Sequence, residues 1–145
     1  MATVRGCHIP DELFYNVDDN VWASLDENGR LTIGMTSYAC SLSGQIVSYT
    51  PRKIGKSVKK NKSCATVESG KWVGPVKAPV SGEIIEINSL LELQPELINT
   101  DPYGKGWIIR MQPQNWSADS VDLVSGALAL ARFDEKMEQD GFGGC

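Results

Sequence analysis

The chain has 145 residues, enough for one domain with a real hydrophobic core. Hydrophobic residues make up 41% of it, which excludes an intrinsically disordered chain. Its net charge of -4 argues against nucleic acid as the main partner, because phosphate binding calls for a basic face. No apolar run approaches the length of a membrane-spanning helix, and the N-terminal residues lack the apolar core of a signal peptide. We therefore expect a cytoplasmic protein with no membrane partner.

Cysteine and histidine usage limits the chemistry that the side chains themselves can perform. No two cysteines form a CxxC pair, so the sequence indicates neither a zinc site nor a thioredoxin-type redox site. In a reducing compartment we expect four free thiols, at Cys7, Cys40, Cys64 and Cys145. His8 is the only histidine and lies in an N-terminal extension predicted over residues 1–14, so neither a Ser-His-Asp nor a Cys-His catalytic group is expected. The sequence thus predicts a protein without a catalytic or metal site of its own.

After the extension, the chain predicts many short strands. Leu31, Ile33 and Met35 alternate with small or polar residues, which is the pattern of a half-buried strand. Further strands are expected at 45–49, 64–68, 72–77, 83–87 and 107–111. Short helical turns are expected at 36–42 and 90–97. Many short strands separated by glycine-containing turns predict a β-sandwich or barrel-like fold.

An internal repeat indicates two related halves. The segment SGQIV at 43–47 recurs as SGEII at 81–85. Each copy has a Ser-Gly pair, one polar residue and two apolar residues, and each overlaps a predicted strand. Because the same pattern starts two strands of so short a domain, it favours a fold built from two similar units.

The longest helix is predicted near the C-terminus, over residues 117–138, with Ser117 as its N-cap. The stripe that should pack on the domain body is Val121, Val124, Leu128 and Ala131. Gly126 weakens this helix. The tail at 139–145 is polar and rich in glycine, so we expect it to be flexible. The domain body then spans residues 15–116.

The most informative local pattern is a predicted hairpin with a lysine at its tip. The strands predicted at 64–68 and 72–77 are joined through Gly70 and Lys71. Glycine at the first central position favours a type II′ turn, because that position needs a positive φ. Lys71 would then project into water from the end of the hairpin. An exposed lysine on a long stem above two fixed strands is the geometry that a swinging-arm carrier requires.

Five motifs within residues 15–116 resemble one known family. They are GMTSYA at 34–39, SGQIV at 43–47, VESGK at 67–71, APVSGEIIEIN at 78–88 and PELINTDPYGKGW at 95–107. On these motifs the chain is identified as a member of the glycine cleavage system H proteins, a family of lipoyl carriers. VESGK matches the lipoylation motif of that family, in which a glutamate precedes the modified lysine by three residues.

The resemblance implies both a fold and a cofactor. The fold would be a flattened barrel-sandwich hybrid, mainly β, of two quasi-symmetric halves with short helices and a C-terminal helix. Lipoate would be attached covalently, by an amide bond to Lys71, and Glu68 would help the lipoate-attaching enzyme to recognise the site. Gly70 would form the turn. A biotin carrier would normally have methionines on both sides of its lysine, and here Gly70 and Trp72 occupy those places.

Other lysines fit the carrier role less well. Lys77 lies on the returning strand of the predicted hairpin, where an arm would be less free. Six basic residues form a run before the hairpin: Arg52, Lys53, Lys56, Lys59, Lys60 and Lys62. This run has two interpretations, a solvated face that blocks edge pairing or a docking surface for an acidic partner enzyme.

Departures from the H-protein pattern bear on the pathway. The segment 20–22 reads Asn-Val-Trp where those proteins usually read His-Glu-Trp, Gly70 replaces a usual valine, and Trp72 replaces a usual alanine. In these places the chain is more similar to the lipoate-binding proteins associated with a heterodisulfide reductase-like complex. By that resemblance, the lipoyl arm would shuttle sulfur-bound intermediates and electrons between partner enzymes in cytoplasmic sulfur oxidation.

Two alternatives are open from the sequence. The first is an H protein of the glycine cleavage system, whose arm carries the aminomethyl group between the glycine cleavage enzymes. The second is an unmodified H-like binding or regulatory module, in which Lys71 stays a free amine. In all three cases we expect a monomer that is not an enzyme by itself.

Overall fold

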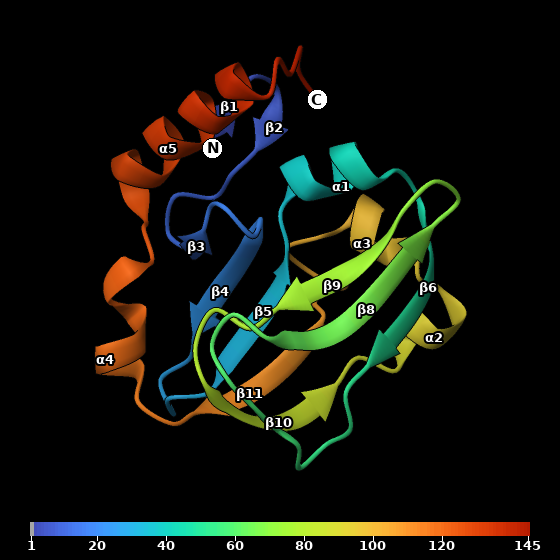
Figure 1. The fold of residues 1–145 in the computed structure, drawn as a ribbon, viewed down its shortest axis with the longest axis vertical. Helices are drawn as coiled ribbons and strands as arrows, with labels where there is room; N and C mark the ends of the chain where they lie inside the picture. The colour runs from blue at the N-terminus through green and yellow to red at the C-terminus, as the bar shows by residue number, and fades with distance from the viewer. Residues whose placement is uncertain (1) are drawn as a thin grey trace.

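The computed structural model describes residues 2–145 and is built on two antiparallel sheets (Figure 1). The larger sheet has the strand order β3-β4-β5-β11-β10-β7. Its strands are β3 Phe14–Asn16, β4 Val21–Leu25, β5 Leu31–Met35, β11 Ile109–Pro113, β10 Gly82–Ile87 and β7 Ser57–Val58. The smaller sheet has the order β6-β8-β9, with β6 Ile46–Pro51, β8 Ser63–Ser69 and β9 Val73–Lys77. The predicted class, a mainly β flattened sandwich with short helices, is confirmed.

The main core lies between the two sheets. Along β8, buried Val67 alternates with exposed Thr66 and Glu68, so that alternate side chains point inward. Leu31 and Ile109 from the facing sheet are fully buried in the same core. This packing fixes β8 and β9, and with them the base of the hairpin that joins these two strands.

The repeated Ser-Gly pair lies at or just before the start of one strand in each sheet. Gly44 precedes β6 in the smaller sheet, and Gly82 is the first residue of β10 in the larger one. Glycine is required at these two positions for different structural reasons. Gly44 has a φ of 79°, whereas a Cβ on Gly82 would lie 2.4 Å from the carbonyl oxygen of Gln112 in β11. The repeat therefore marks two strand starts with different local constraints.

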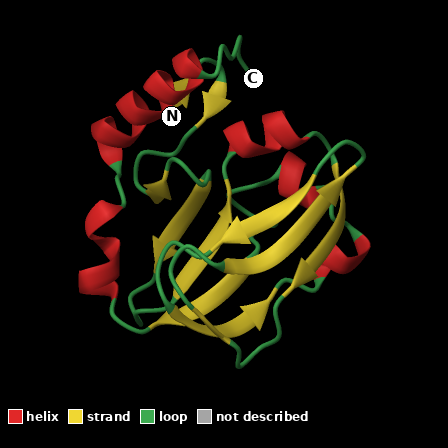
Figure 2. Ribbon diagram, viewed as in Figure 1, coloured by secondary structure: helices red, strands yellow, loops and turns green. Residues whose placement is uncertain are grey.

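Helices border the two sheets, and the longest of them lies along one side of the sandwich (Figure 2). They are α1 Ser37–Ser43, α2 Leu90–Leu93, α3 Leu97–Thr100, α4 Trp116–Asp119, a 3-10 turn Ser120–Asp122 and α5 Gly126–Gln139. None of the helices in the described residues is both long and apolar enough to span a membrane.

The single helix predicted over 117–138 is wrong in its extent. The chain instead forms α4, the 3-10 turn and then α5, which begins at Gly126 with a φ of 60°. The helical path is interrupted before Gly126, because Leu123 and Ser125 are extended and Val124 exchanges two backbone hydrogen bonds with Tyr15. Asn115 rather than Ser117 caps α4, because the Asn115 side chain accepts a hydrogen bond from the Ala118 N–H.

The face of α5 that packs on the domain also differs from the predicted stripe. Val121 is 79% exposed and Leu128 is 51% exposed. The fully buried residues are instead Ala129, Phe133 and Met137, which are four residues apart and share one side of the helix. Because Val121 precedes the break in the helix, it cannot lie in line with that side.

Within the predicted N-terminal extension, a strand pair packs against α5. β1 Thr3–Val4 pairs with β2 Cys7–His8, and both lie beside α5 in Figure 1. They contribute to a second apolar cluster, which also contains Tyr15 and Trp22 from the outer face of the larger sheet and Phe133 from α5. The two ends of the chain are thus packed together on one side of the sandwich.

Two of the four cysteines form a disulfide, so the expectation of four free thiols is wrong. Cys7 in β2 is bonded to Cys145, and their Cα atoms are 4.9 Å apart. The Cys145 N–H also donates to the Arg5 carbonyl at 2.9 Å. The tail at 139–145 is therefore held on the domain instead of being flexible. The two free cysteines are both buried: Cys40 and Cys64.

Candidate functional site

Lys71 lies at the tip of the β8–β9 hairpin, where the sequence predicted it. β8 ends at Ser69 and β9 begins at Val73, which leaves Gly70, Lys71 and Trp72 in the connection. The Lys71 side chain is exposed, and it forms no ion pair with any residue of the described chain. Figure 1 shows this tip beyond the ends of the two strands, next to α1.

Ser69 orders the turn. Its backbone N–H donates to the Trp72 carbonyl at 2.7 Å, and its hydroxyl donates to the same carbonyl at 3.4 Å and accepts from the Lys71 N–H at 3.3 Å. Gly70 does not have a positive φ, and nothing lies within 4 Å of the place where its Cβ would be. The predicted type II′ turn is therefore wrong. Gly70 lies in the turn, but the backbone does not require glycine there.

The stem of Lys71 lies over the C-terminal end of α1. A Cβ on Gly44 would be 3.2 Å from Cε and 3.9 Å from Nζ of Lys71. Gly44 also has a φ of 79° and a ψ of -174°, a backbone region that is essentially restricted to glycine. The helix beneath begins after Thr36, whose hydroxyl accepts from the Ala39 N–H at 3.1 Å. The GMTSYA motif thus builds the helix whose end supports the stem.

Asn99 holds the chain beneath the lysine from α3. Its side-chain amide donates to the Gly44 carbonyl at 2.9 Å, and its side-chain oxygen accepts from the Ile46 N–H at 2.8 Å. The Cys40 thiol donates to the Ile98 carbonyl at 3.2 Å and so joins α1 to α3. Sequence reasoning missed these supports. Gly44 and Asn99 both lie in family motifs, which could have indicated that they matter. Their contact could not be predicted, because it joins segments about fifty residues apart.

Replacing Gly44 by alanine is expected to destabilise the protein by about 1–3 kcal/mol, because a Cβ is strained at this φ and ψ. The new methyl group would also displace the Lys71 stem. Gly70→Ala is the matched control in the same site, and its effect should stay within about 0.5 kcal/mol. Urea unfolding of the two variants measures the difference. Equal effects of the two substitutions would contradict this account of the site.

Glu68 presents a free carboxylate near the lysine. It lies on the outer face of β8, opposite Ser48 of β6 and Val73 of β9. Its side chain is exposed, and within the described part of the chain it has no ion-pair partner. A partner enzyme that approaches Lys71 over the outer face would therefore meet this carboxylate. Its role in recognition stays a prediction.

A pocket of about 210 Å³ opens beside the hairpin tip. Its wall includes Ser43 and Trp72, which are the sequence neighbours of Gly44 and Lys71. Most of the remaining wall is apolar, and Asp19 is the only carboxylate in it. The base of an arm on Lys71 would thus adjoin a sheltered space with one acidic group.

Lys77 lies at the other end of the hairpin and does not share the position of Lys71. It is the last residue of β9, and its Nζ is 3.8 Å from Oδ1 of Asp19. Its predicted place on the returning strand is confirmed, and that an arm there would be less free stays a prediction. Among residues 2–145, no group of three or more His, Cys, Asp or Glu side chains is placed to hold a metal ion.

Comparisons with known proteins agree on one family. The family model described as Glycine cleavage H-protein matches residues 13–136. Glycine cleavage system H protein 5 of Aquifex aeolicus (strain VF5) is 55% identical over 145 residues, covering 97% of this chain and 97% of that protein. Probable glycine cleavage system H protein 2 of Sulfurisphaera tokodaii is 39% identical over 142 residues, covering 97% and 95%. The crystal structure of a glycine cleavage system H protein from Mycobacterium marinum aligns with a TM-score of 0.74 at 31% identity, covering 92% of this chain and 99% of that one.

These matches agree with the geometry of the site. The matched span includes the whole of the β8–β9 hairpin and the helices beneath it. H proteins are non-catalytic subunits that carry a covalently attached lipoate on a lysine. An exposed lysine on an ordered hairpin suits that attachment. The chain belongs to the glycine cleavage H-protein family, whose members are lipoyl carriers.

Proposed function

We propose that this chain is the H-type lipoyl carrier of a glycine cleavage system and that its lipoyl group is attached to Nζ of Lys71. The position of Lys71 carries the proposal, because it is an exposed amine at the tip of an ordered hairpin, within the VESGK motif. The relatives named above are all H proteins of the glycine cleavage type, which supports that pathway.

The residues around Lys71 fit a covalently attached arm. Amide formation needs an amine that the attaching enzyme can reach, and no ion pair among the described residues restrains this one. Gly44 leaves a path for the stem, while Ser69 and Asn99 hold the backbone at its base through hydrogen bonds. Only the arm then needs to move when it visits a partner enzyme.

The lipoyl group supplies a cyclic disulfide that opens to two thiols. The protein holds the base of the arm, presents Glu68 on the outer face, and offers the adjoining pocket. Its free thiols do not compete with the lipoyl sulfurs, because burial raises the pKa of both Cys40 and Cys64 to about 12 and keeps them protonated. The reactions at the arm therefore belong to the partner enzymes.

Incubation of the lipoylated protein, with its arm in the disulfide form, with glycine decarboxylase and glycine tests the pathway, because decarboxylation releases CO2 and leaves the aminomethyl group on one sulfur. The carrier is expected to gain an aminomethyl group on its arm, which intact-mass spectrometry detects. The unlipoylated chain is the matched control and should gain nothing. Failure of the lipoylated chain to load, beside a reference H protein that loads in the same assay, would contradict the glycine cleavage proposal.

Trp72 favours a second candidate, the predicted relay of sulfur with a heterodisulfide reductase-like complex. It is 39% exposed and lines the pocket beside Lys71, at a place where the family usually has alanine. A partner enzyme would therefore meet an indole next to the arm. The comparisons support glycine cleavage better than sulfur oxidation, and none of them supports a heterodisulfide reductase-like partner. Under this second candidate the wild-type chain should load poorly in the glycine assay, and Trp72→Ala should load better.

A further inference from the structure

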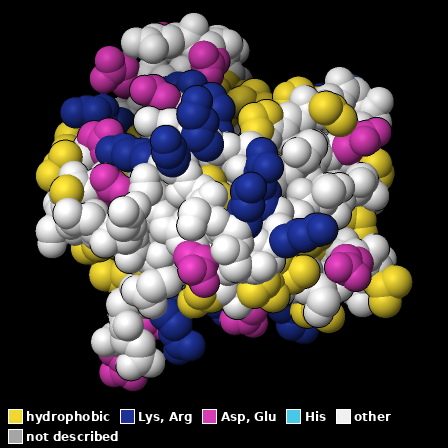
Figure 3. All heavy atoms as spheres, turned by 60° about the horizontal axis from the view of Figure 1, so that its bottom comes forward, with side chains coloured by type: hydrophobic (Ala, Val, Ile, Leu, Met, Phe, Trp, Pro, Cys, Tyr) yellow, Lys and Arg dark blue, Asp and Glu magenta, His cyan; other side chains and the backbone are white. Residues whose placement is uncertain are grey.

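The loop between β6 and β8 carries a group of unpaired positive charges. Of the six basic residues in the run, Lys60 forms an ion pair with Asp122 at 2.7 Å. The other five form no ion pair within residues 2–145, and all are exposed: Arg52, Lys53, Lys56, Lys59 and Lys62. We call these five residues, with the exposed Ile54, the basic patch. Figure 3 turns the lower end of Figure 1 toward the viewer, and Lys and Arg side chains run across the middle of this face.

Protection of a sheet edge explains only part of this patch. Lys56 and Lys59 flank β7, the edge strand of the larger sheet, and charged residues there discourage pairing with another chain. Arg52 and Lys53 directly follow β6, an edge strand of the smaller sheet, so the same reason extends to them. It does not extend to Lys62, which precedes the central strand β8. Five like charges in one area repel one another, and the chain keeps them although its net charge is -4. A binding role accounts for the whole group.

The surface of the basic patch is hollowed. A cavity of about 460 Å³ is lined by Arg52, Lys53 and Lys56, together with residues of β6 and β8. A second hollow of about 220 Å³ shares Arg52 and Lys56 with the first and adds Lys59 and Lys62. Ile54, between Lys53 and Lys56 in the chain, is 59% exposed. The patch therefore combines a cationic groove with one accessible apolar side chain.

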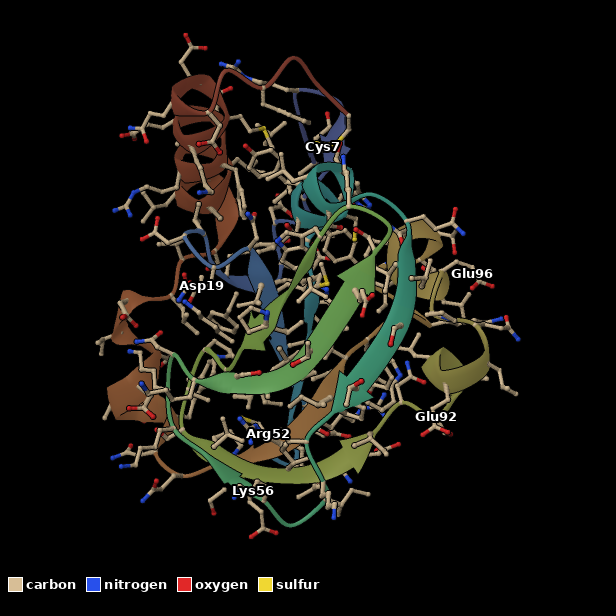
Figure 4. The ribbon with its side chains drawn as sticks, turned by 45° about the vertical axis from the view of Figure 1, so that its right-hand side comes forward. Cys7, Asp19, Arg52, Lys56, Glu92 and Glu96 are labelled. Atoms are coloured by element: carbon tan, nitrogen blue, oxygen red, sulfur yellow. A yellow bond between two sulfur atoms is a disulfide. The ribbon has the colours of Figure 1, made fainter. Side chains whose placement is uncertain are left out.

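The basic patch and Lys71 lie at opposite ends of the same strand. The Arg52 N–H donates to the Cys64 carbonyl at 3.0 Å, and its Nε donates to the Ser63 carbonyl at 3.0 Å, so Arg52 is fixed to the start of β8. Lys71 follows Ser69, the end of β8. Seven strand residues span about 20 Å at about 3.3 Å per residue. Figure 4 shows Arg52 and Lys56 at the end of the three-stranded sheet away from the hairpin tip. A protein bound to the patch would leave the lysine free.

We propose that the basic patch docks a carboxylate-rich surface of a partner protein that carries an apolar side chain opposite Ile54. Charge complementarity selects acidic partners and speeds their association, while the apolar contact adds affinity. A protein partner fits better than nucleic acid, because 18 acidic residues on the rest of the chain repel an extended phosphate backbone. Docking needs no lipoyl group, so the inference stands apart from the proposed function.

The test uses the unmodified full-length chain and a synthetic peptide in which glutamates and aspartates flank one leucine. Calorimetric titration at physiological ionic strength measures binding. Lys53→Glu with Lys56→Glu is expected to weaken binding by about tenfold or more. The matched control is Lys105→Glu with Arg132→Glu, two exposed cations without ion pairs in the described chain. Either pair of substitutions moves the net charge from -4 to -8, because each replaces a positive charge with a negative one. The control should change binding by less than about twofold.

Further binding measurements identify the class of the partner. Ile54→Ser should weaken binding of the leucine peptide but not of the same peptide with serine in place of leucine. No peptide binding, or equal loss in both charge-reversal variants, would overturn the proposal. Tighter binding of duplex DNA or of phosphatidylglycerol vesicles than of the peptide would also overturn it. Lipoylation of each variant, measured by intact mass, should be unchanged, so a failure of docking is distinct from a failure of the carrier function.

Discussion

Replacing Lys71 by arginine is expected to abolish lipoylation and, with it, all turnover of the carrier. Arginine keeps a long stem and a positive charge, but its guanidinium does not offer the primary amine that forms the lipoyl amide. Stability should change by less than about 0.5 kcal/mol, because the Lys71 side chain is exposed and forms no ion pair in the described chain. Intact mass after co-expression with a lipoate-attaching enzyme measures modification, and the glycine decarboxylase assay measures turnover.

Lys77→Arg is the matched control for this variant. Lys77 belongs to the same hairpin but lies at its other end and pairs with Asp19. This control should be lipoylated as fully as the wild type. Lipoylation that persists in Lys71→Arg, or that disappears in Lys77→Arg, would contradict the assignment of the lipoyl group to Lys71.

Loss of the Cys7–Cys145 disulfide is expected to lower the free energy of unfolding by about 2–4 kcal/mol. The bond joins residues 138 apart in sequence, so it greatly restricts the unfolded chain. It also holds the tail against β2, close to the contact between the rings of Tyr38 and Phe142. The double variant Cys7→Ser/Cys145→Ser avoids leaving an unpaired thiol. Urea unfolding of this variant and of the wild type measures the difference.

A reducing agent supplies the control for the disulfide. It should destabilise the wild type to about the level of the double variant and leave the double variant unchanged. Thiol counting in urea should find two reactive cysteines in the unreduced wild type, Cys40 and Cys64, and four after reduction. Four reactive thiols before reduction would contradict the observed pairing.

The strand pattern and the carrier lysine could be predicted because their causes are local. Alternating burial along the second half of β8 and along β9 follows from a side-chain period of two, which the sequence displays directly. Lys71 lies between two such runs, so its place at a tip needs no long-range contact. The family motifs then distinguished it from Lys77 and from the basic run.

The features that sequence reasoning missed depend on contacts between distant segments. The hydrogen bond from the Asn99 side chain to the Gly44 carbonyl joins α3 to the end of α1. The disulfide between Cys7 and Cys145 joins the two ends of the chain. Neither follows from spacing, since connectivity among four cysteines is not encoded in their positions. The turn at Gly70 was misjudged for another reason. Glycine permits a positive φ but does not require one, and here the hydroxyl of Ser69 orders the turn.

The break in the C-terminal helix shows how a short extended segment changes the buried face. The path from α4 ends at Leu123, because Val124 exchanges two backbone hydrogen bonds with Tyr15, and α5 begins only at Gly126, so the stripe that was extrapolated across this stretch is lost. The helix then buries Phe133 and Met137, which the predicted stripe did not include. Periodicity alone could not reveal this break, because it depends on the pairing of Val124 with Tyr15, which is about one hundred residues away in the chain.

The most direct measurement is peptide mapping by tandem mass spectrometry of the protein isolated from its native cells. It should find one lipoyl group per chain, on the peptide that contains Lys71. A lipoyl group on any other lysine, or a native protein in which Lys71 is always a free amine, would contradict the carrier role assigned to this hairpin.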